Sequence, residues 1–277
     1  MKRLNLFILL QKQRRQLNNG TVTKKPLNLN KWIVTVVMIL GFIYSVMITQ
    51  LDFTQLFANL GDFTEILVKM CSPDWGYLDK ITNPLLETIK MSILGTLIGS
   101  VIAFPYALLV SQNIVKNKIV TGVFRFILNI IRTIPNLLLG AIFVAIIGIG
   151  AVTGVFALAV FTFGMVSKLF YEAIETIDEG PIEALTAVGA SKMQIIRYGV
   201  LPQVMSYYIS YVLYAFEINV RSSTILGYIG AGGIGLFLER SLSMYRYDRV
   251  GLIVLVTFIV ILVIDEISNR SREALTK

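Results

Sequence analysis

The chain alternates between long apolar stretches and shorter polar segments. A helix of roughly 20 apolar residues crosses the hydrocarbon core of a bilayer, and six stretches approach that length. Three closely spaced glycines, Gly148, Gly150 and Gly154, indicate a turn between the third and fourth stretches, since one fused helix would be about twice as long as a span needs. The pattern therefore predicts about six transmembrane helices, at residues 32–51, 88–112, 123–149, 151–170, 204–220 and 250–267.

Lysines and arginines near the span ends predict the orientation of these helices. Residues 1–31 contain eight of them and no acidic residue, whereas residues 52–84 contain two, Lys69 and Lys80. Because positive charge favours the cytoplasmic side, we expect both termini in the cytoplasm. Three arginines argue against this orientation, since it places them on an outer segment: Arg240, Arg246 and Arg249.

This arrangement divides the chain into four parts. Residues 1–31 form a basic cytoplasmic tail, and residues 32–84 hold the first span and an external segment. Apolar residues at helical spacing between positions 52 and 70 predict an interfacial helix in that external segment. Residues 85–270 form the core, which includes a polar inner loop at 171–203, and residues 271–277 form a second cytoplasmic tail.

Composition supports an all-α, polytopic membrane bundle and excludes several classes of enzyme. The chain is 55% hydrophobic and only 15% charged, against roughly 25% charged residues in an average soluble domain. With no histidine and one cysteine, Cys71, it cannot form a Cys/His zinc site, a haem histidine ligand, a Ser-His-Asp triad or an internal disulfide. The net charge of +8 is carried mainly at span ends, so we expect a lipid bilayer and no nucleic acid as partner.

The inner loop at 171–203 carries the most informative motif, GPIEALTAVGASKMQIIRYGVLPQ. Pro181 can start a helix, and Gly189 allows a bend or a close approach between two short helices. Such a segment could be a docking element or an ordinary amphipathic helix on the lipid headgroups. The run resembles the coupling-loop signature of permeases of bacterial binding-protein-dependent ABC importers, which reads Glu-Ala-Ala, three residues, Gly, nine residues, then Ile-x-Leu-Pro. Five residues match at that spacing: Glu183, Ala184, Gly189, Leu201 and Pro202.

Two positions depart from that signature. Leu185 replaces the third small residue, and Gly199 stands where isoleucine is usual. The resemblance implies a type I permease fold with a cytoplasmic coupling helix that sits in a groove of a separate ATPase subunit. The sequence agrees, because it contains no Gly-x4-Gly-Lys-[Ser/Thr] phosphate loop. We therefore expect a chain that is not itself an enzyme and holds no cofactor or metal, with ATP and Mg²⁺ bound by two copies of a partner ATPase.

Polar residues inside the predicted spans are candidates for a translocation pathway. Glu217 and Arg221 are four residues apart, so they can pair on one face of a helix, either as part of the route or as a structural ion pair. Arg132 precedes Pro135, which can kink the third span, and snorkelling to the inner surface is the alternative explanation for this arginine. The candidate pathway residues are Arg132, Glu217, Asn219, Arg221, Ser222, Ser223 and Thr224.

A glycine-rich run follows the fifth span and comprises Gly230, Gly232, Gly233 and Gly235. It lacks the strand, helix and acidic partner of a dinucleotide-binding motif. Glycines near a membrane edge allow backbones to approach closely or a segment to turn beside a cavity. These four residues are therefore candidates for gating or for close packing.

From about residue 85 onward the chain also resembles the phosphonate permease family. The resemblance rests on four segments, which contain Arg132–Pro135, Gly180–Glu183, Arg197–Gln203 and Asn219–Gly235. It implies a homodimer in a bacterial cell membrane that, with an external phosphonate-binding protein, imports phosphonate or a related oxyanion such as phosphite by alternating access. A permease of the same architecture for methionine, nitrate or a polyamine is the alternative, followed by a membrane anchor that transports nothing.

Overall fold

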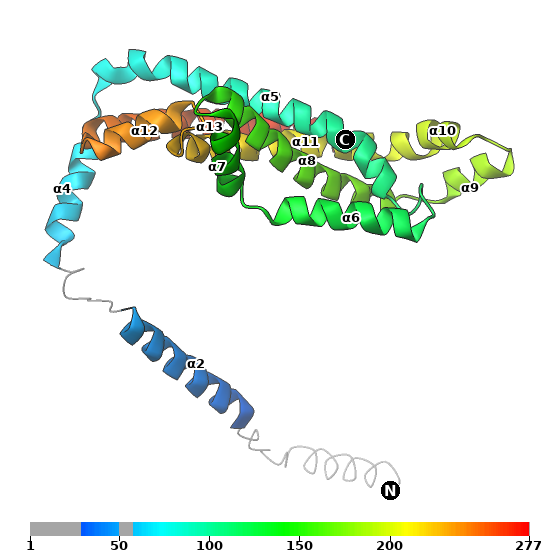
Figure 1. The fold of residues 1–277 in the computed structure, drawn as a ribbon, viewed down its shortest axis with the longest axis horizontal. Coiled ribbons are helices and arrows are strands. Elements are labelled where there is room, and N and C mark those ends of the chain that lie inside the picture. The colour runs from blue at the N-terminus through cyan, green and yellow to red at the C-terminus, as the bar shows by residue number, and fades with distance from the viewer. Residues whose placement is uncertain (1–28, 50–57, 277) are drawn as a thin grey trace, which may run out of the picture. The chain divides into compact units, whose positions relative to one another are not determined.

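The computed structural model describes residues 29–49 and 58–276, and every regular element among them is a helix (Figure 1). The chain divides into two compact units, Met1–Leu60 and Gly61–Lys277. In the first unit, α2 (Leu29–Ile48) buries none of its apolar stretch within the chain, as suits a helix surrounded by lipid. The predicted first span agrees with α2 up to Ile48, whereas residues 50 and 51 lie outside the described residues.

The second unit contains the remaining helices. In chain order they are α4 (Leu60–Met70), which begins at the boundary between the units, a short 3-10 helix (Trp75–Tyr77), α5 (Leu78–Val110), α6 (Lys118–Thr133), α7 (Asn136–Ile147), α8 (Ala151–Glu175), α9 (Gly180–Ala187), α10 (Lys192–Gln194), a π-helix (Ile195–Val200), α11 (Leu201–Tyr228), α12 (Ile234–Ser243) and α13 (Tyr247–Thr276). Helices α5, α8, α11 and α13 run lengthwise, and α9 and α10 lie at the opposite end from α12 (Figure 1).

Helices α5 and α8 form the centre of this bundle, with α11 packed against both. Their close approach depends on two glycines of α5, Gly95 and Gly99, which stand four residues apart. A Cβ added to Gly95 would lie 2.6 Å from Leu158 Cβ, and one added to Gly99 would lie 2.4 Å from the Ala159 carbonyl oxygen. These glycines therefore allow the backbones of the two helices to pack closely.

Buried polar side chains join the same three helices. Asn219 of α11 donates hydrogen bonds from Nδ2 to Thr96 Oγ1 of α5 at 2.8 Å and to Thr162 Oγ1 of α8 at 2.7 Å. One turn further along, Ser92 Oγ and Ser223 Oγ lie 3.1 Å apart. These bonds fix the register of α11 on the other two helices, because a buried polar group without a partner would be costly.

The predicted number of spans stays a prediction. Among the described residues, four helices are long and apolar enough to cross a membrane, and α6 with α7 would make a fifth. Although α11 has 28 residues, it is not among them. Polar side chains such as Glu217 and Asn219, which are buried inside the bundle, lower its hydropathy. A hydropathy pattern identifies lipid-facing helices better than helices that bury polar groups against other helices.

The predicted third span is broken rather than continuous. Helices α6 and α7 meet at an angle of 88°, with Ile134 and Pro135 between them in extended conformation. Proline disfavours a helical residue before it and cannot donate a backbone hydrogen bond, so a break is favoured here. The predicted turn before the next helix is confirmed, because Gly148 and Gly150, both with positive φ, separate α7 from α8.

Several helices extend past the apolar windows that predicted them. Helix α5 starts at Leu78, ten residues before the predicted span, so the expected domain boundary at 84/85 falls inside it. Helix α11 continues to Tyr228, and α13 runs through the predicted C-terminal tail to Thr276. A hydropathy pattern detects only the part of a helix that faces lipid, so it does not detect the polar turns at the ends of a helix.

The predicted external segment is helical over Leu60–Met70, as α4, while positions 52–57 of the predicted interfacial helix lie outside the described residues. The end of α4 contacts α13 closely, because a Cβ on Gly251 would lie 2.0 Å from the Met70 carbonyl oxygen. Arg246 and Arg249, which argued against the predicted orientation, both lie within ion-pair distance of Asp74, at 3.9 and 3.5 Å. Nearby acidic side chains thus offset part of their charge.

Candidate coupling element and translocation residues

The predicted coupling loop forms a hairpin-like element closed at its base, which we call the coupling element (residues 178–203). Asp178 Oδ1 accepts a hydrogen bond from the Gly180 N–H at 3.0 Å at the start of α9. Gln203 ties the two ends together: its Nε2 donates to the Asp178 and Gly199 carbonyls at 3.2 and 2.7 Å, and its Oε1 accepts from the Asp178 N–H. A side chain in the first turn of α11 thus fixes where the element leaves the bundle.

The turn between α9 and α10 depends on the conformation of Gly189. Its φ is +81°, its N–H donates to the Thr186 carbonyl at 3.0 Å, and the Ala190 N–H donates to the Leu185 carbonyl at 3.0 Å. This pattern is a Schellman motif, which favours glycine at the left-handed position. An added Cβ would meet no atom within 4 Å. The bend expected at Gly189 is present, whereas a close helix approach at this residue is not.

The departure from the family signature at Gly199 has a structural counterpart. The π-helix that contains Gly199 packs against α9, and a Cβ there would lie 3.1 Å from Leu185 Cδ1 and 3.6 Å from Ile182 Cγ1. Leu185, the other departure, therefore supplies the side chain that Gly199 accommodates. Leu201 and Pro202 form the first turn of α11.

The outward side of the coupling element carries apolar side chains that sequence reasoning missed. Val188 is 80% exposed, Met193 72% and Tyr198 62%. The matched residues Glu183 and Ala184 are also exposed. Large apolar side chains outside the membrane-spanning helices mark surfaces for a protein partner. The sequence could have indicated these three residues, because they are large apolar residues within an otherwise polar loop.

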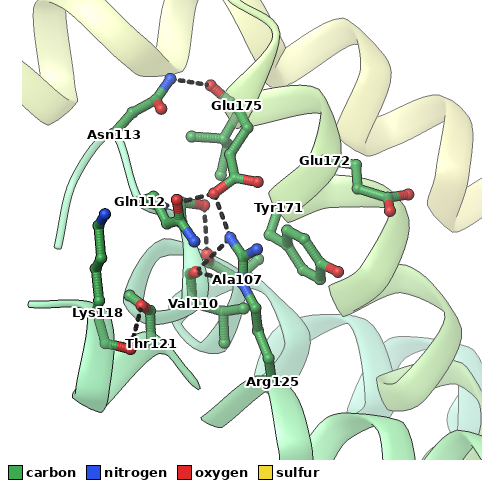
Figure 2. A network of polar contacts seen from close by, with 12 residues as sticks. Ala107, Val110, Gln112, Asn113, Lys118, Thr121, Arg125, Tyr171, Glu172 and Glu175 are labelled. Carbon is green, nitrogen blue, oxygen red and sulfur yellow. Dashed lines mark hydrogen bonds and ion pairs between the residues drawn. The ribbon is translucent and has the colours of Figure 1, made fainter. Parts of the chain in front are cut away.

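A second group of polar contacts anchors the bundle beside the coupling element (Figure 2). Arg125 of α6 pairs with Glu175 at the end of α8 and donates to the Val110 carbonyl at 3.2 Å. Glu175 Oε1 also accepts the Gln112 N–H at 2.7 Å, and Asn113 Nδ2 donates to the Ile174 carbonyl at 3.0 Å. The connection between α5 and α6 is thereby fastened to α8 three residues before the coupling element begins.

The sequence around this anchor does not reveal it. Glu175 stands near three other acidic residues, Glu172, Asp178 and Glu179, a pattern typical of a solvated face, yet its side chain is only 24% exposed and is paired. Arg125 stands near the start of the predicted third span, where a basic residue indicates only the orientation of a helix. Fifty residues separate the two partners, so no local spacing could connect them.

Glu217 and Arg221 pair as predicted, within a larger charged cluster. Arg221 also lies 3.1 Å from Asp265 of α13, and Arg272 of α13 lies 2.9 Å from Glu217. Two arginines and two carboxylates therefore neutralise one another between α11 and α13. In the part of the chain that the structure describes, no three His, Cys, Asp or Glu side chains gather into a group that could hold a metal ion.

The other predicted pathway residues of α11 point in different directions. Asn219 and Ser223 are fully buried and bonded to α5 and α8. Ser222 is partly exposed and its Oγ accepts a hydrogen bond from Asn136 Nδ2 at 3.3 Å, at the start of α7. The carbonyl of Thr224 faces Gly235, where an added Cβ would lie only 2.0 Å away. The structure thus brings the segments that follow Arg132 and Arg221 together through Asn136 and Ser222.

The glycine-rich run turns the chain sharply between α11 and α12. Gly230, Gly232 and Gly233 all have positive φ. A Cβ on Gly232 would lie 2.8 Å from the Ala151 backbone nitrogen, and one on Gly233 would lie 2.4 Å from Thr88 Oγ1. Thr88 Oγ1 accepts the Ile234 N–H at 2.8 Å at the start of α12. The run is tightly packed at the end of the bundle opposite the coupling element.

The fold and the coupling element define the class of this protein as a helical membrane permease. The family of binding-protein-dependent transport system inner membrane components matches residues 88–276, and the chain belongs to this family. It is 40% identical over 223 residues to the phosphite transport system permease PtxC of Stutzerimonas stutzeri, covering 80% of this chain and 81% of PtxC. It is 34% identical to the phosphate-import permease PhnE of Mycolicibacterium smegmatis, covering 80% of this chain and 41% of PhnE.

A comparison with solved structures supports the fold. The MetNI methionine ABC transporter in an inward-facing conformation has a chain that matches with a TM-score of 0.67 and 24% identity, covering 74% of this chain and 100% of that one. The predicted type I permease fold is thereby confirmed. Membership of the family makes this chain a multi-pass bacterial inner membrane component of a binding-protein-dependent transport system.

Proposed function

We propose that this permease imports phosphite or phosphonate, driven by ATP that a separate subunit hydrolyses. The identity with the phosphite permease PtxC over most of both chains supports the substrate class. The observation that carries the transport mechanism is the coupling element, which presents exposed apolar side chains at one end of the bundle. Such a surface suits a groove of an ATPase subunit, as the matching residues Glu183, Ala184, Gly189, Leu201 and Pro202 suggest.

The coupling element would transmit ATPase movements to the bundle by alternating access. Gln203 ties the base of the element to α11, and the pair of Arg125 and Glu175 ties α6 to α8 nearby. A displacement of the ATPase groove would therefore move packed helices together and switch the bundle between inward-facing and outward-facing arrangements. Two copies of the ATPase and two copies of this chain would form the working complex, and pairing with a second, similar permease is the alternative.

The orientation in the membrane follows from the same proposal. The coupling element and both termini would be cytoplasmic, and the end that carries α12 would face the external binding protein. The predicted pathway residues remain candidates for contact with substrate during transit, and the four glycines remain candidates for gating or packing. We propose that ATP and Mg²⁺ bind only to the partner ATPase.

The test is ATP hydrolysis by the permease reconstituted in lipid with its ATPase and binding protein. Methylphosphonate, phosphite, phosphate and methionine would be compared with no ligand. Stimulation by methylphosphonate or phosphite is the expected result. Stimulation by methionine alone would support an ATP-driven importer but contradict the proposed substrate class. The absence of any ATPase partner would favour a membrane anchor that transports nothing.

Phosphate is the second candidate substrate, because PhnE of M. smegmatis is a phosphate-import permease and is 34% identical to this chain. The same assay separates the two candidates. Stimulation by phosphate that equals or exceeds stimulation by phosphite would favour phosphate.

Gly189 offers a prediction about coupling. Replacing Gly189 with alanine should weaken the stimulated ATPase activity, since a non-glycine residue in the left-handed region costs roughly 1–2 kcal/mol. Gly189→Asn is the matched control, because asparagine tolerates this conformation better. An added Cβ meets open space, so the comparison isolates backbone conformation. Gly189→Trp should leave insertion intact and block docking, because its side chain would project from an exposed turn.

The measurement is ATPase activity of each variant with loaded binding protein, alongside the amount of permease that inserts in the membrane. Wild-type stimulation in both Gly189→Ala and Gly189→Trp would contradict the assignment of this turn to the ATPase interface.

A further inference from the structure

The two arginines predicted on the translocation pathway differ in their electrostatic surroundings. Arg221 lies between Glu217 and Asp265, so its charge is neutralised within the chain. Arg132 is exposed at the end of α6 and makes no ion pair or side-chain hydrogen bond with any residue that the structure describes. One arginine is thus part of a neutral cluster, while the other is a cation without a counter-ion among the residues that the structure describes.

Arg132 also lies near the middle of the bundle's depth. Its stem passes over Gly164 of α8, where an added Cβ would lie 3.0 Å from Arg132 Cγ. Gly164 is about 20 Å from the start of α8 and about 16 Å from its end, at 1.5 Å per residue. In a bilayer centred on α8, with a hydrocarbon core about 30 Å thick, the side chain would lie near mid-membrane. Snorkelling, the alternative considered from the sequence, would then need the longest reach to either surface.

A cavity adjoins the same side chain. It has a volume of about 220 Å³ and lies between the break of the third span and α8. Of the described residues that line it, Arg132 alone is charged, and the walls include Ile134, Phe161 and Met165. This volume is many times the space that one water molecule needs. It can hold a small oxyanion with a short apolar substituent.

We infer that Arg132 is the cation that contacts the permeating oxyanion in the middle of the membrane. The inference rests on the proposed function and narrows it, because it assigns Arg221 to the structural cluster instead of the route. A charge at this depth is costly unless it is paired, and a permeating anion would pair it during transit. A lipid-facing role would leave the charge unpaired.

The chemistry of the cavity favours one kind of oxyanion. A guanidinium group binds two oxygens of phosphite or phosphonate at once. The apolar walls suit the P–H side of phosphite or the alkyl side of a phosphonate. Phosphate would direct a fourth oxygen at walls that offer it no donor, which is unfavourable for a buried polar atom. The site therefore fits phosphite and small alkylphosphonates better than phosphate.

The experiment measures radiolabelled phosphite uptake and ATP hydrolysis in the same proteoliposomes, which contain the permease and its ATPase with loaded binding protein outside. Arg132→Gln should lower uptake about ten- to hundredfold, as expected for loss of a charge-assisted contact. Hydrolysis stimulated by the binding protein should persist, so phosphite moved per ATP falls. Arg132→Lys should recover part of the uptake, because it keeps the charge. Arg270→Gln is the matched control, since Arg270 is 78% exposed in a pair with Glu266, and it should behave as wild type.

Three results would overturn the inference. The first is wild-type phosphite transport per ATP in Arg132→Gln. The second is failure of Arg132→Gln to assemble in gel filtration together with rescue by Arg132→Lys, because an acidic residue of a second permease copy would then be the counter-ion. The third arises if the wild type imports neither phosphite nor phosphonate, in which case the proposed function fails. The variants would then be assayed with the solute that is imported, and an unchanged variant or a neutral solute would overturn the role of Arg132 as well.

Discussion

Replacement of Glu217 by glutamine should cost this protein more stability than any other single change to its charged residues. Glu217 is 8% exposed and pairs with Arg221 on its own helix and with Arg272 on α13. Breaking a fully buried ion pair costs about 3–5 kcal/mol. The arginines left behind here are 48% and 25% exposed, so we expect a smaller cost of about 1–3 kcal/mol. The charge of the cluster would change from zero to +1. We expect a lower melting temperature in detergent and less permease in the membrane.

Glu266→Gln is the matched control for this prediction. Glu266 pairs with Arg270 on the exposed side of α13, and their side chains are 60% and 78% exposed. An exposed pair of this kind contributes at most about 1 kcal/mol. The double variant Glu217→Gln/Arg272→Gln should recover part of the loss, because it restores neutrality. Equal melting temperatures for Glu217→Gln and Glu266→Gln would show that the cluster does not hold α11 to α13.

The membrane helices could be predicted from the sequence where their outer faces meet lipid. The apolar window at 151–170 falls within α8, and the window at 88–112 falls within α5 except for its last two residues. The proline at 135 predicted a kink, although the angle of 88° depends on how α7 packs across α8 and could not be read from the chain. Helix α11 was the least defined because its polar residues are satisfied by other helices, which a hydropathy pattern cannot represent.

The candidate pathway residues could be found from the sequence, but residues on the pathway could not be distinguished from residues with a structural role. Spacing predicted the pair Glu217 and Arg221, since its members are four residues apart. It could not predict Asp265, which is 44 residues from Arg221 and neutralises it, so Arg132 and Arg221 looked equivalent. Asn219 likewise looked like a pathway residue until its partners on α5 and α8 were seen. Long-range pairing is decided by packing, which a single sequence does not contain.

Gly99→Ala should separate the two central helices and destabilise the bundle by about 3 kcal/mol, at the upper end of the usual cost of overpacking. The added Cβ would lie 2.4 Å from the Ala159 carbonyl oxygen, 2.6 Å from Thr162 Cβ and 2.9 Å from the Phe163 nitrogen. Two of these atoms belong to the backbone, so no side-chain rotation relieves the clash. Thr162 also accepts a hydrogen bond from Asn219, and its displacement should weaken the contact with α11.

The matched control is Gly122→Ala in α6, where an added Cβ meets no atom within 4 Å. Alanine is favoured over glycine in a helix by about 1 kcal/mol, so this variant should be as stable as the wild type or slightly more stable. Thermal unfolding in detergent, measured by the loss of monodisperse protein on gel filtration, compares the two. If Gly99→Ala and Gly122→Ala unfolded at the same temperature, α5 and α8 could move apart without loss of stability. Their close approach would then not hold the bundle together. A much lower unfolding temperature for Gly99→Ala than for Gly122→Ala would instead show that backbone contact between α5 and α8 stabilises the core. Such contact is important in a membrane, because lipid provides no hydrophobic driving force for apolar side chains to associate.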